Sequence, residues 1–274
     1  MLTSSVVLYK TRAVQLSALI DCVKKSGIMD KIYFVDNSPD ESLRALCEAV
    51  EKSEYIFNGK NIGYGAAHNI AIKKAIQAGS EYHIVLNPDI KFEPDVLPKL
   101  VEFMDGNSDV VYVLPKVVYP NGELQYLCKL LPTPFDLIFR RFMPKTKLVQ
   151  KINDRYTLKI SGYDKIINPP CLSGCFMFMR TGALEKSNIF FDDRYFMYCE
   201  DFDLIRRLHR VGKTLFYPDV TIIHDHAKES YKNKKMLFEH IKSAIKYFNK
   251  FGWFFDKERR DMNEKVLGEI NNYH

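Results

Sequence analysis

The feature that most constrains this 274-residue chain is the alternation of short apolar runs with amphipathic segments over its first 114 residues. Runs rich in β-branched and aromatic residues predict strands at 4–9, 31–36, 54–57, 82–86 and 109–114. Helices are predicted between them at 12–25, from Asp40 as an N-cap, at 65–78 and at 94–104. Strands that alternate with helices of about 10–15 residues form a mostly parallel sheet covered on both faces. We therefore expect an α/β fold that binds its ligand outside the carboxyl ends of the strands.

This alternation ends after Leu114. Residues 119–122 (YPNG) predict a hairpin turn, and the basic, proline-containing stretch 129–165 gives no clear pattern. Later segments predict strands at 171–179, 214–217 and 220–224, and helices at 200–211, 231–251 and 256–271. We expect one α/β domain over 1–226 and a helical extension over 227–274.

The net charge of +6 is unevenly distributed. Residues 129–165 hold nine Lys/Arg and three Asp, and residues 228–274 hold eleven Lys/Arg and seven Asp/Glu, which leaves an acidic body. A nonspecific nucleic-acid binder is usually basic throughout, so an anionic ligand or a membrane surface fits better. Residues 135–152 contain both aromatic and basic residues, a mixture that suits an anionic lipid headgroup or a polyprenyl-diphosphate acceptor. A solvated loop over the active site explains this stretch equally well.

The sequence also indicates a compartment. No apolar run approaches the roughly 18 residues of a membrane span, and no charged segment precedes the apolar N-terminal run, as a signal peptide requires. The cysteines lack the spacing of a structural zinc site; they are Cys22, Cys47, Cys128, Cys171, Cys175 and Cys199. We expect a cytoplasmic protein with reduced thiols.

Polar clusters follow several predicted strands. Asp36 closes the second strand, either as a ligand for a base or ribose edge or as part of an exposed turn. Residues 61–69 (NIGYGAAHN) lack the third glycine of a dinucleotide fingerprint and follow the wrong strand, so that interpretation is rejected. They form either a loop that places a diphosphate on a helix N-terminus or a plain connection.

Two further clusters contain metal-ligating or acid–base side chains. Asn87 and Asp89 close the fourth strand and could hold a hard cation, which His224 could complete. Glu200 and Asp201 begin a helix and are predicted to face the crevice, while Asp203 can pair with Arg206 or Arg207. A favourable interaction with the helix dipole is an equally good explanation for these acids.

The order of these motifs resembles family 2 glycosyltransferases of GT-A fold, in particular the rhamnosyltransferase-like branch. The resemblance covers roughly residues 4–226 and rests on an ordered series of segments: Asp36 after a strand, 61–69, 86–89 (LNPD), 172–180 (LSGCFMFMR), 191–204 (FDDRYFMYCEDFDL) and 217–224 (YPDVTIIH).

The resemblance implies roles for individual residues. Residues 1–115 would bind the nucleotide sugar, and 116–226 would form the acceptor and catalytic half. The donor-site residues would be Tyr9, Asp36 (against the base), Asn61, Gly63, Gly65 and Asn87. Asn87 replaces the first acid of the family's D-x-D motif, so Asp89 with His224 would hold Mg²⁺ or Mn²⁺. Asp201 would be the catalytic base, with Glu200 as the substitute. Tyr9 alone is carried over from the first strand, where Leu8-Tyr9-Lys10 replaces Thr-Tyr-Asn.

The function implied is inverting, metal-dependent transfer of a sugar from a nucleotide-diphosphate donor, with dTDP-rhamnose favoured. The acceptor would be a hydroxyl of a glycan or polyprenyl-linked saccharide in cell-surface polysaccharide synthesis, with peripheral contact to the inner face of the cell membrane left open. Two other functions fit the residues: a noncatalytic sugar-binding subunit, and a metal-dependent hydrolase built on 224–226 (HDH).

Overall fold

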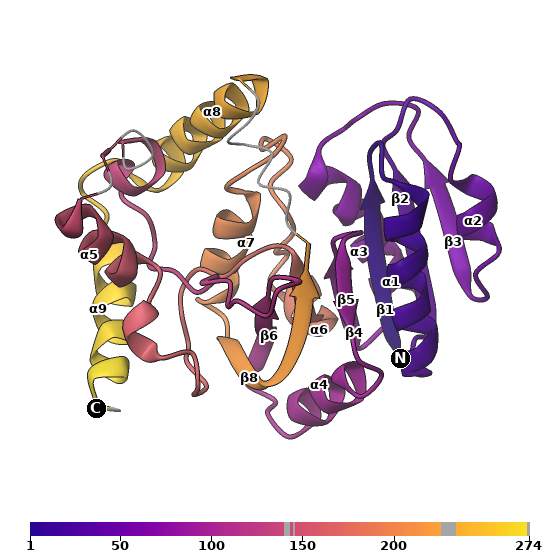
Figure 1. Cartoon of the computed structure of the whole chain (residues 1–274), viewed down its shortest axis with the longest axis horizontal. Coiled ribbons are helices and arrows are strands. Elements are labelled where there is room, and N and C mark those ends of the chain that lie inside the picture. The colour runs from indigo at the N-terminus through magenta and orange to yellow at the C-terminus, as the bar shows by residue number, and fades with distance from the viewer. Residues whose placement is uncertain (140–142, 145, 226–233, 273–274) are drawn as a thin grey trace.

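The computed structural model describes residues 1–139, 143–144, 146–225 and 234–272. Within them, eight strands form one sheet in the order β3-β2-β1-β4-β7-β6-β8-β5 (Figure 1). Their bounds are β1 (Leu2–Leu8), β2 (Lys31–Asp36), β3 (Ser53–Phe57), β4 (Tyr82–Leu86), β5 (Ile90–Phe92), β6 (Val110–Val118), β7 (Phe176–Arg180) and β8 (Lys213–His224). The first four strands of this order are parallel, β7 is antiparallel to both neighbours, and β5 is antiparallel to β8. The predicted α/β fold with a mostly parallel sheet is confirmed.

The α-helices are α1 (Ala13–Ser26), α2 (Arg44–Glu48), α3 (Tyr64–Gln77), α4 (Val96–Asp105), α5 (Lys147–Tyr156), α6 (Thr181–Lys186), α7 (Glu200–Leu208), α8 (Lys234–Phe251) and α9 (Lys257–Asn271). A π-helical turn, η1 (Phe135–Phe139), and a 3₁₀ turn, η3 (Lys159–Ser161), complete the list. Figure 1 shows α5, α8 and α9 gathered at the end of the molecule opposite β3.

Alternating side chains of β2 explain why both faces of the sheet are covered. Phe34 belongs to the same buried cluster as Leu16 of α1, whereas Val35 packs with Ala67 of α3. Successive strand residues point to opposite faces, so α1 and α3 must lie on opposite sides. The small alanines of α3 also let that helix lie close to the sheet.

Several predicted boundaries were wrong for local reasons. Asp40 does not cap α2: its carboxylate accepts from the Ser42 N–H at 3.1 Å, and the helix begins only at Arg44. The two late strands predicted around Pro218 form the single strand β8, with a register shift against β6. The strand predicted from Cys171 begins at Phe176, because the preceding residues form a loop. Sequence reasoning missed β5 and α6, which are only three and six residues long.

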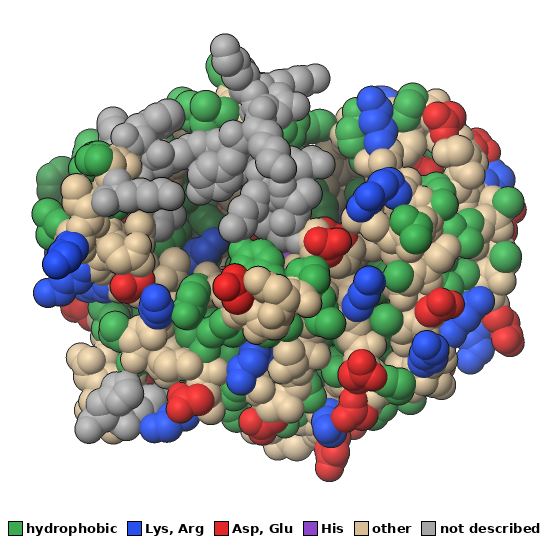
Figure 2. Space-filling model, viewed as in Figure 1, with side chains coloured by type: hydrophobic (Ala, Val, Ile, Leu, Met, Phe, Trp, Pro, Cys, Tyr) green, Lys and Arg blue, Asp and Glu red, His purple; other side chains and the backbone are tan. Residues whose placement is uncertain are grey.

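The basic stretch contains a short amphipathic helix, α5. Val149 is buried on its inner side, while Lys147, Leu148 and Lys151 are exposed. Figure 2 shows basic and hydrophobic side chains together at this end of the molecule. Residues 140–142 and 145 of the stretch, like His226 and the start of the predicted helix 231–251, lie outside the described residues, so lipid contact stays a prediction. In the described part of the chain, none of the helices has the length and apolarity needed to cross a membrane.

The C-terminal helices are joined to α7 through a buried arginine. The Arg206 side chain is 1% exposed and donates to both carboxylate oxygens of Asp256, at 2.8 and 2.7 Å. It also donates to Glu258 at 2.6 Å and to the Tyr247 hydroxyl at 3.3 Å. Of the two predicted partners of Asp203, Arg207 is confirmed, with a nitrogen–oxygen distance of 2.6 Å. Arg206 is not a partner, because it pairs instead with Asp256 at the start of α9.

We expect Arg206→Met to lower the free energy of unfolding by about 3–5 kcal/mol, because it leaves the buried Asp256 carboxylate without its partner. Arg210→Met is the matched control, since Arg210 pairs with the same Glu258 from a side chain that is 44% exposed. An exposed pair of this kind contributes about 0–1 kcal/mol. Urea denaturation of both variants measures the difference, and equal losses would show that burial of Arg206 is not decisive.

Candidate active site

The carboxyl ends of β1 and β2 carry the residues predicted to meet the donor. Tyr9 follows β1 and is 47% exposed, so its ring is available to a ligand. Asp36, the last residue of β2, is fully buried and accepts from the Tyr55 hydroxyl at 2.7 Å and the Ser38 N–H at 2.8 Å. These two hydrogen bonds fix the orientation of the Asp36 carboxylate. Its predicted contact with the nucleotide base therefore has to use the remaining acceptor capacity.

Asn37, which the predictions did not include, ties the donor loops together. Its side-chain amide donates to the Gly63 carbonyl at 3.2 Å and to Asn61 Oδ1 at 3.3 Å, and its Oδ1 accepts from Asn58 at 2.8 Å. Asn61 in turn accepts from the Gly63 N–H at 3.0 Å. The loop that precedes α3 is thus held in place by a network of amide hydrogen bonds.

The glycines of this loop are needed for close packing. A Cβ atom on Gly63, whose φ is +97°, would lie 2.7 Å from the Phe196 carbonyl oxygen, and one on Gly65 would lie 2.8 Å from the Phe191 Cβ. The Tyr64 N–H at the start of α3 already donates to the Phe196 carbonyl at 3.1 Å. One of the N–H groups at this helix N-terminus is therefore already used by the chain itself, and the diphosphate site there stays a prediction.

Two pairs of strand ends bring the cation candidates together. Leu86 of β4 pairs with Phe176 of β7, and Ile90 of β5 pairs with His224 of β8. His224 Nε2 lies 3.4 Å from Asp89 Oδ1 and 3.5 Å from the Asn87 amide nitrogen. Sequence reasoning had joined Asp89 and His224 from positions more than 130 residues apart, and the structure confirms that they are neighbours.

Asp89 and His224 together offer ligand atoms that fit a divalent cation. Asp89 Oδ1 is buried and has no hydrogen-bond partner. The other ring nitrogen of His224, Nδ1, lies 3.2 Å from Gln125 Oε1, the kind of second contact that orients a metal-binding imidazole. Burial lowers the pKa of His224, but Cys175 and Asp89 outweigh it and raise the pKa to about 10. No group of three His, Cys, Asp or Glu side chains in the described ranges could hold a metal, so ligands from a substrate would have to complete the site.

The second centre is the carboxylate pair at the start of α7. Tyr198 and Cys199, which precede the pair, have φ angles of +69° and +63°, a strained conformation often found at functional sites. Asp201 accepts from the Phe202 N–H at 2.9 Å and from the Gly174 N–H at 3.1 Å. Glu200 is 7% exposed, and its Oε2 is buried without a hydrogen-bond partner.

Burial has the largest effect on the pKa of both carboxyl groups. It raises the pKa of Glu200, and the neighbouring Asp201 charge raises it further. Burial also raises the pKa of Asp201, while the two backbone N–H donors and a nearby lysine act in the opposite direction. Asp201 therefore ionises in preference to Glu200, as a general base requires.

Tyr64 connects the two centres. Its hydroxyl lies 3.0 Å from Asn87 Oδ1 and donates to the Gly174 carbonyl at 2.8 Å, and the Gly174 N–H holds Asp201. Burial raises the pKa of Tyr64, so the phenol keeps its proton and stays a donor. The sequence signal for this residue was its place in the 61–69 motif, although no role had been assigned to it.

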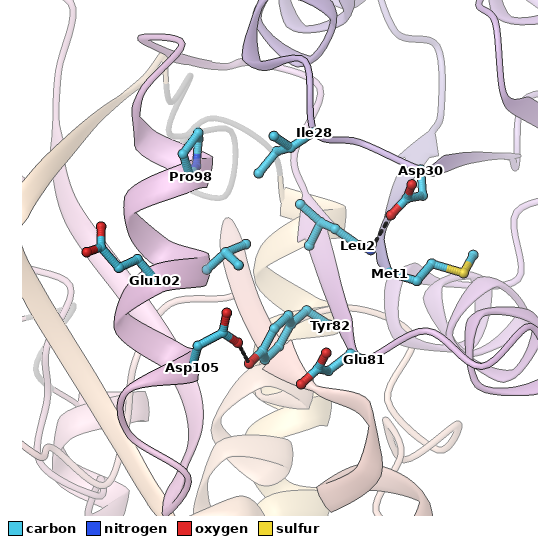
Figure 3. Close-up of a pocket in the computed structure, with 10 residues that line it drawn as sticks. Met1, Leu2, Ile28, Asp30, Glu81, Tyr82, Pro98, Glu102 and Asp105 are labelled. Carbon is cyan, nitrogen blue, oxygen red and sulfur yellow. Dashed lines mark hydrogen bonds between the residues drawn. The ribbon is translucent and has the colours of Figure 1, made fainter.

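A separate hollow of about 600 Å³ lies at the other end of the strands, away from the candidate site (Figure 3). It is lined by the amino ends of β1 and β4, including Leu2 and Tyr82, and by acidic side chains such as Asp30 and Asp105. Asp30 accepts from the Leu2 N–H and Asp105 from the Tyr82 hydroxyl, so both acids are already paired. The candidate site lies at the carboxyl ends, as expected for this class of sheet.

A metal-dependent hydrolase built on 224–226 would need further ligands nearby, and the other histidines to consider among the described residues are His209 and His240; His226 lies outside the described residues. His209 Nδ1 is 2.7 Å from the Thr214 hydroxyl, and His240 packs against the ring of Tyr198. Neither extends the Asp89–His224 pair. Within the described residues, the site therefore combines a two-residue cation candidate with a separate carboxylate pair.

Comparison with solved structures identifies the fold. GalNAc-T7 with UDP, GalNAc and Mn²⁺ superposes with a TM-score of 0.63 at 14% identity, over 89% of this chain and 47% of that one. Staphylococcus aureus TarS gives 0.60 at 16% identity, over 100% of this chain and 43% of that one. The chain thus spans less than half the length of either protein and shares their GT-A glycosyltransferase fold.

Comparison of sequences identifies the family. The model described as "Glycosyl transferase family 2" matches residues 5–187, and the chain belongs to that family. Rhamnosyltransferase WbbL of Escherichia coli (strain K12) is 30% identical over 230 residues, 79% of this chain and 81% of that protein. The N-acetylglucosaminyl-diphospho-decaprenol L-rhamnosyltransferase of Mycobacterium tuberculosis is 24% identical over 210 residues, 72% of this chain and 66% of that protein. The protein is accordingly a glycosyltransferase.

The close approach at Gly65 yields a test of the loop. We expect Gly65→Ala to lower the free energy of unfolding by about 1–3 kcal/mol and to reduce turnover, because the added methyl group displaces the segment at Phe191 that leads to the carboxylate pair. Gly182→Ala in α6 is the control, since nothing lies within 4 Å of its added Cβ. Denaturation and activity assays on both would refute the packing role if Gly65→Ala behaved like Gly182→Ala.

Proposed function

We propose that the protein is an inverting, cation-dependent glycosyltransferase that moves rhamnose from dTDP-rhamnose to a hydroxyl group in cell-surface polysaccharide synthesis. The observation that carries this proposal is the chain of contacts between two centres. His224 of the Asp89–His224 pair lies beside Asn87, Asn87 contacts Tyr64, and Tyr64 leads through Gly174 to the buried Glu200–Asp201 pair. One centre can take the diphosphate end of the donor, and the other can take the acceptor proton.

Asp201 acts as the general base in this proposal. It removes the acceptor hydroxyl proton as the acceptor oxygen bonds to the anomeric carbon, and the bond from that carbon to the diphosphate oxygen breaks. The electron pair leaves with the nucleotide diphosphate. A direct displacement of this kind inverts the anomeric centre. The two backbone N–H groups hold Asp201 in orientation, while Glu200 stays protonated beside it.

Asp89 and His224 would hold a divalent cation, which neutralises charge on the departing diphosphate. Gln125 orients the imidazole, and Asn87 lies close enough to share the site. Because a cation binds neutral imidazole, binding at His224 would release a proton. Mn²⁺ in the GalNAc-T7 structure supports a divalent ion for this fold.

The names of the relatives support the choice of substrates. WbbL is a rhamnosyltransferase, and the mycobacterial relative is named for transfer of L-rhamnose to a decaprenol-diphosphate-linked N-acetylglucosamine. We therefore propose a glycan or a polyprenyl-diphosphate-linked saccharide as the acceptor. The basic stretch with α5 is the part of the acceptor half suited to an anionic diphosphate.

Asp201→Asn should lower turnover by about 10²–10⁴-fold, because the acceptor hydroxyl loses its base. Donor binding should be unchanged, since Asp201 does not touch the cation candidates. Release of dTDP in the presence of acceptor measures turnover, and calorimetric titration with dTDP-rhamnose measures binding. Asp219→Asn, at an exposed position of β8, is the matched control.

Three outcomes would contradict parts of this assignment. Near-normal turnover in Asp201→Asn would move the base to Glu200. A wild-type protein that binds dTDP-rhamnose without transferring the sugar would be a noncatalytic subunit. Failure to bind any nucleotide-diphosphate sugar would remove the donor site altogether.

Asp89→Ala should abolish the effect of Mn²⁺ on donor affinity. We expect the wild type to bind dTDP-rhamnose at least about tenfold more tightly with Mn²⁺ than with chelator, which corresponds to about 1.4 kcal/mol. The variant should bind equally weakly in both conditions. Asp95→Ala is the control, because Asp95 is exposed and pairs with Lys99 on α4, away from the cation candidates. Metal dependence that survives in Asp89→Ala would refute the ligand role.

A further inference from the structure

Lys129 lies beside the carboxylate pair but has no place in the mechanism above. Its backbone N–H donates to the Cys171 carbonyl at 2.8 Å, which joins the basic stretch to the loop that contains Gly174. Its ammonium nitrogen lies 5.1 Å from the centre of the Phe202 ring, and Phe202 directly follows Asp201. The side chain is half-buried, so solvent screens its charge only in part.

The charge of Lys129 acts unequally on the two carboxylates. It is the leading influence that lowers the pKa of Asp201 against the effect of burial. The pKa of Glu200 is raised by burial and by Asp201. Two carboxylates this close do not ionise independently, so a cation near one of them decides which carries the first negative charge.

Within the residues that the structure describes, the other titratable groups whose pKa is affected by Asp201 are neutral, Glu200 apart. They are Cys199 at the start of α7, Cys171 in the facing loop, Tyr112 on β6 and Tyr64 on α3. Burial raises the pKa of each of these groups, so the thiols and phenols keep their protons. None of them can replace the positive charge of Lys129.

We propose that Lys129 is a positioning residue whose ammonium group, held over Phe202, places the negative charge of the carboxylate pair on Asp201. This rests on the proposed function in one respect, namely that Asp201 is the base. The charge of Lys129 keeps Asp201 ionised at neutral pH while Glu200 retains its proton. The two carboxyl groups thereby take different roles although they are adjacent in the chain.

Lys129→Met tests the role by removing the charge while keeping a long side chain over the ring. The pKa of Asp201 should rise, so the acid limb of the kcat/KM profile should move to higher pH by roughly one unit. At a fixed pH on the acid side of the profile, a shift of this size lowers kcat/KM about tenfold. At high pH, where Asp201 is ionised in both proteins, kcat/KM should return to the wild-type value. Lys129→Arg keeps the cation and should leave the limb in place. The assay follows dTDP release from dTDP-rhamnose with a short-chain polyprenyl-diphosphate N-acetylglucosamine.

Lys159→Met is the matched control. Lys159 belongs to the same basic stretch and lies at the same 5.1 Å from an aromatic ring, that of Tyr126, but its ionic partner is Asp154. Its loss removes one positive charge and one cation–π contact without affecting Asp201. The acid limb should therefore not move in this variant.

A direct titration separates this inference from the proposed function. In protein labelled with ¹³C at the aspartate carboxyl carbon, the Asp201 signal is assigned by its absence in Asp201→Asn. Its midpoint should rise in Lys129→Met and stay unchanged in Lys129→Arg and Lys159→Met. An unchanged midpoint in Lys129→Met overturns the inference, whatever the activity. A shifted midpoint in a protein that transfers no sugar supports the role of Lys129 and refutes the proposed function.

Discussion

The placement of the carboxylate pair depends on one buried cation, Arg206. The pair occupies the first turn of α7, and Arg206 fixes that helix to Asp256 and Glu258 at the start of α9. Lys250 of α8 adds a second tie by pairing with Asp203 at 2.5 Å. Buried ion pairs contribute little net stability, but they are satisfied only when the helices that carry their partners lie in one relative position. The C-terminal helices are therefore part of the framework that holds α7 and its carboxylate pair, although the sequence suggested an appended extension.

Sequence reasoning succeeded where a signal was local and repeated. The exact bounds of β2 and β4 followed from short apolar runs, and the carboxyl-end rule placed Asp36 and Asn87 correctly. The pairing of Asp89 with His224 came from motif order, and the antiparallel register of β5 with β8 accounts for it. The start of β7 was misjudged because the apolar run at Cys171 begins in a loop, whose residues Cys171, Leu172 and Cys175 are buried in the hydrophobic clusters without being part of a strand.

Long-range packing explains what the sequence could not supply. Gly63 and Gly65 resembled part of a phosphate-binding loop, yet the atoms that exclude their side chains belong to Phe196 and Phe191, more than 120 residues later. A glycine that leaves room for a phosphate and a glycine that leaves room for a distant part of the chain look the same in the local sequence. Lys129 was one of nine cations in a stretch without periodicity, and it is singled out by long-range contacts, namely its backbone bond to Cys171 and its ammonium group over the Phe202 ring.

A single hydroxyl group joins the two halves of the site. The Tyr64 oxygen lies on α3 and contacts Asn87 at the cation candidate and Gly174, whose N–H donates to Asp201. The phenol is buried, so loss of either contact leaves a polar atom unpaired at a cost of about 1–3 kcal/mol. The donor loop and the base are thus favoured in one joint arrangement. In the proposed mechanism, this coupling would hold the Asp89–His224 pair and the Asp201 carboxylate in the relative positions that a leaving group and an attacking hydroxyl need.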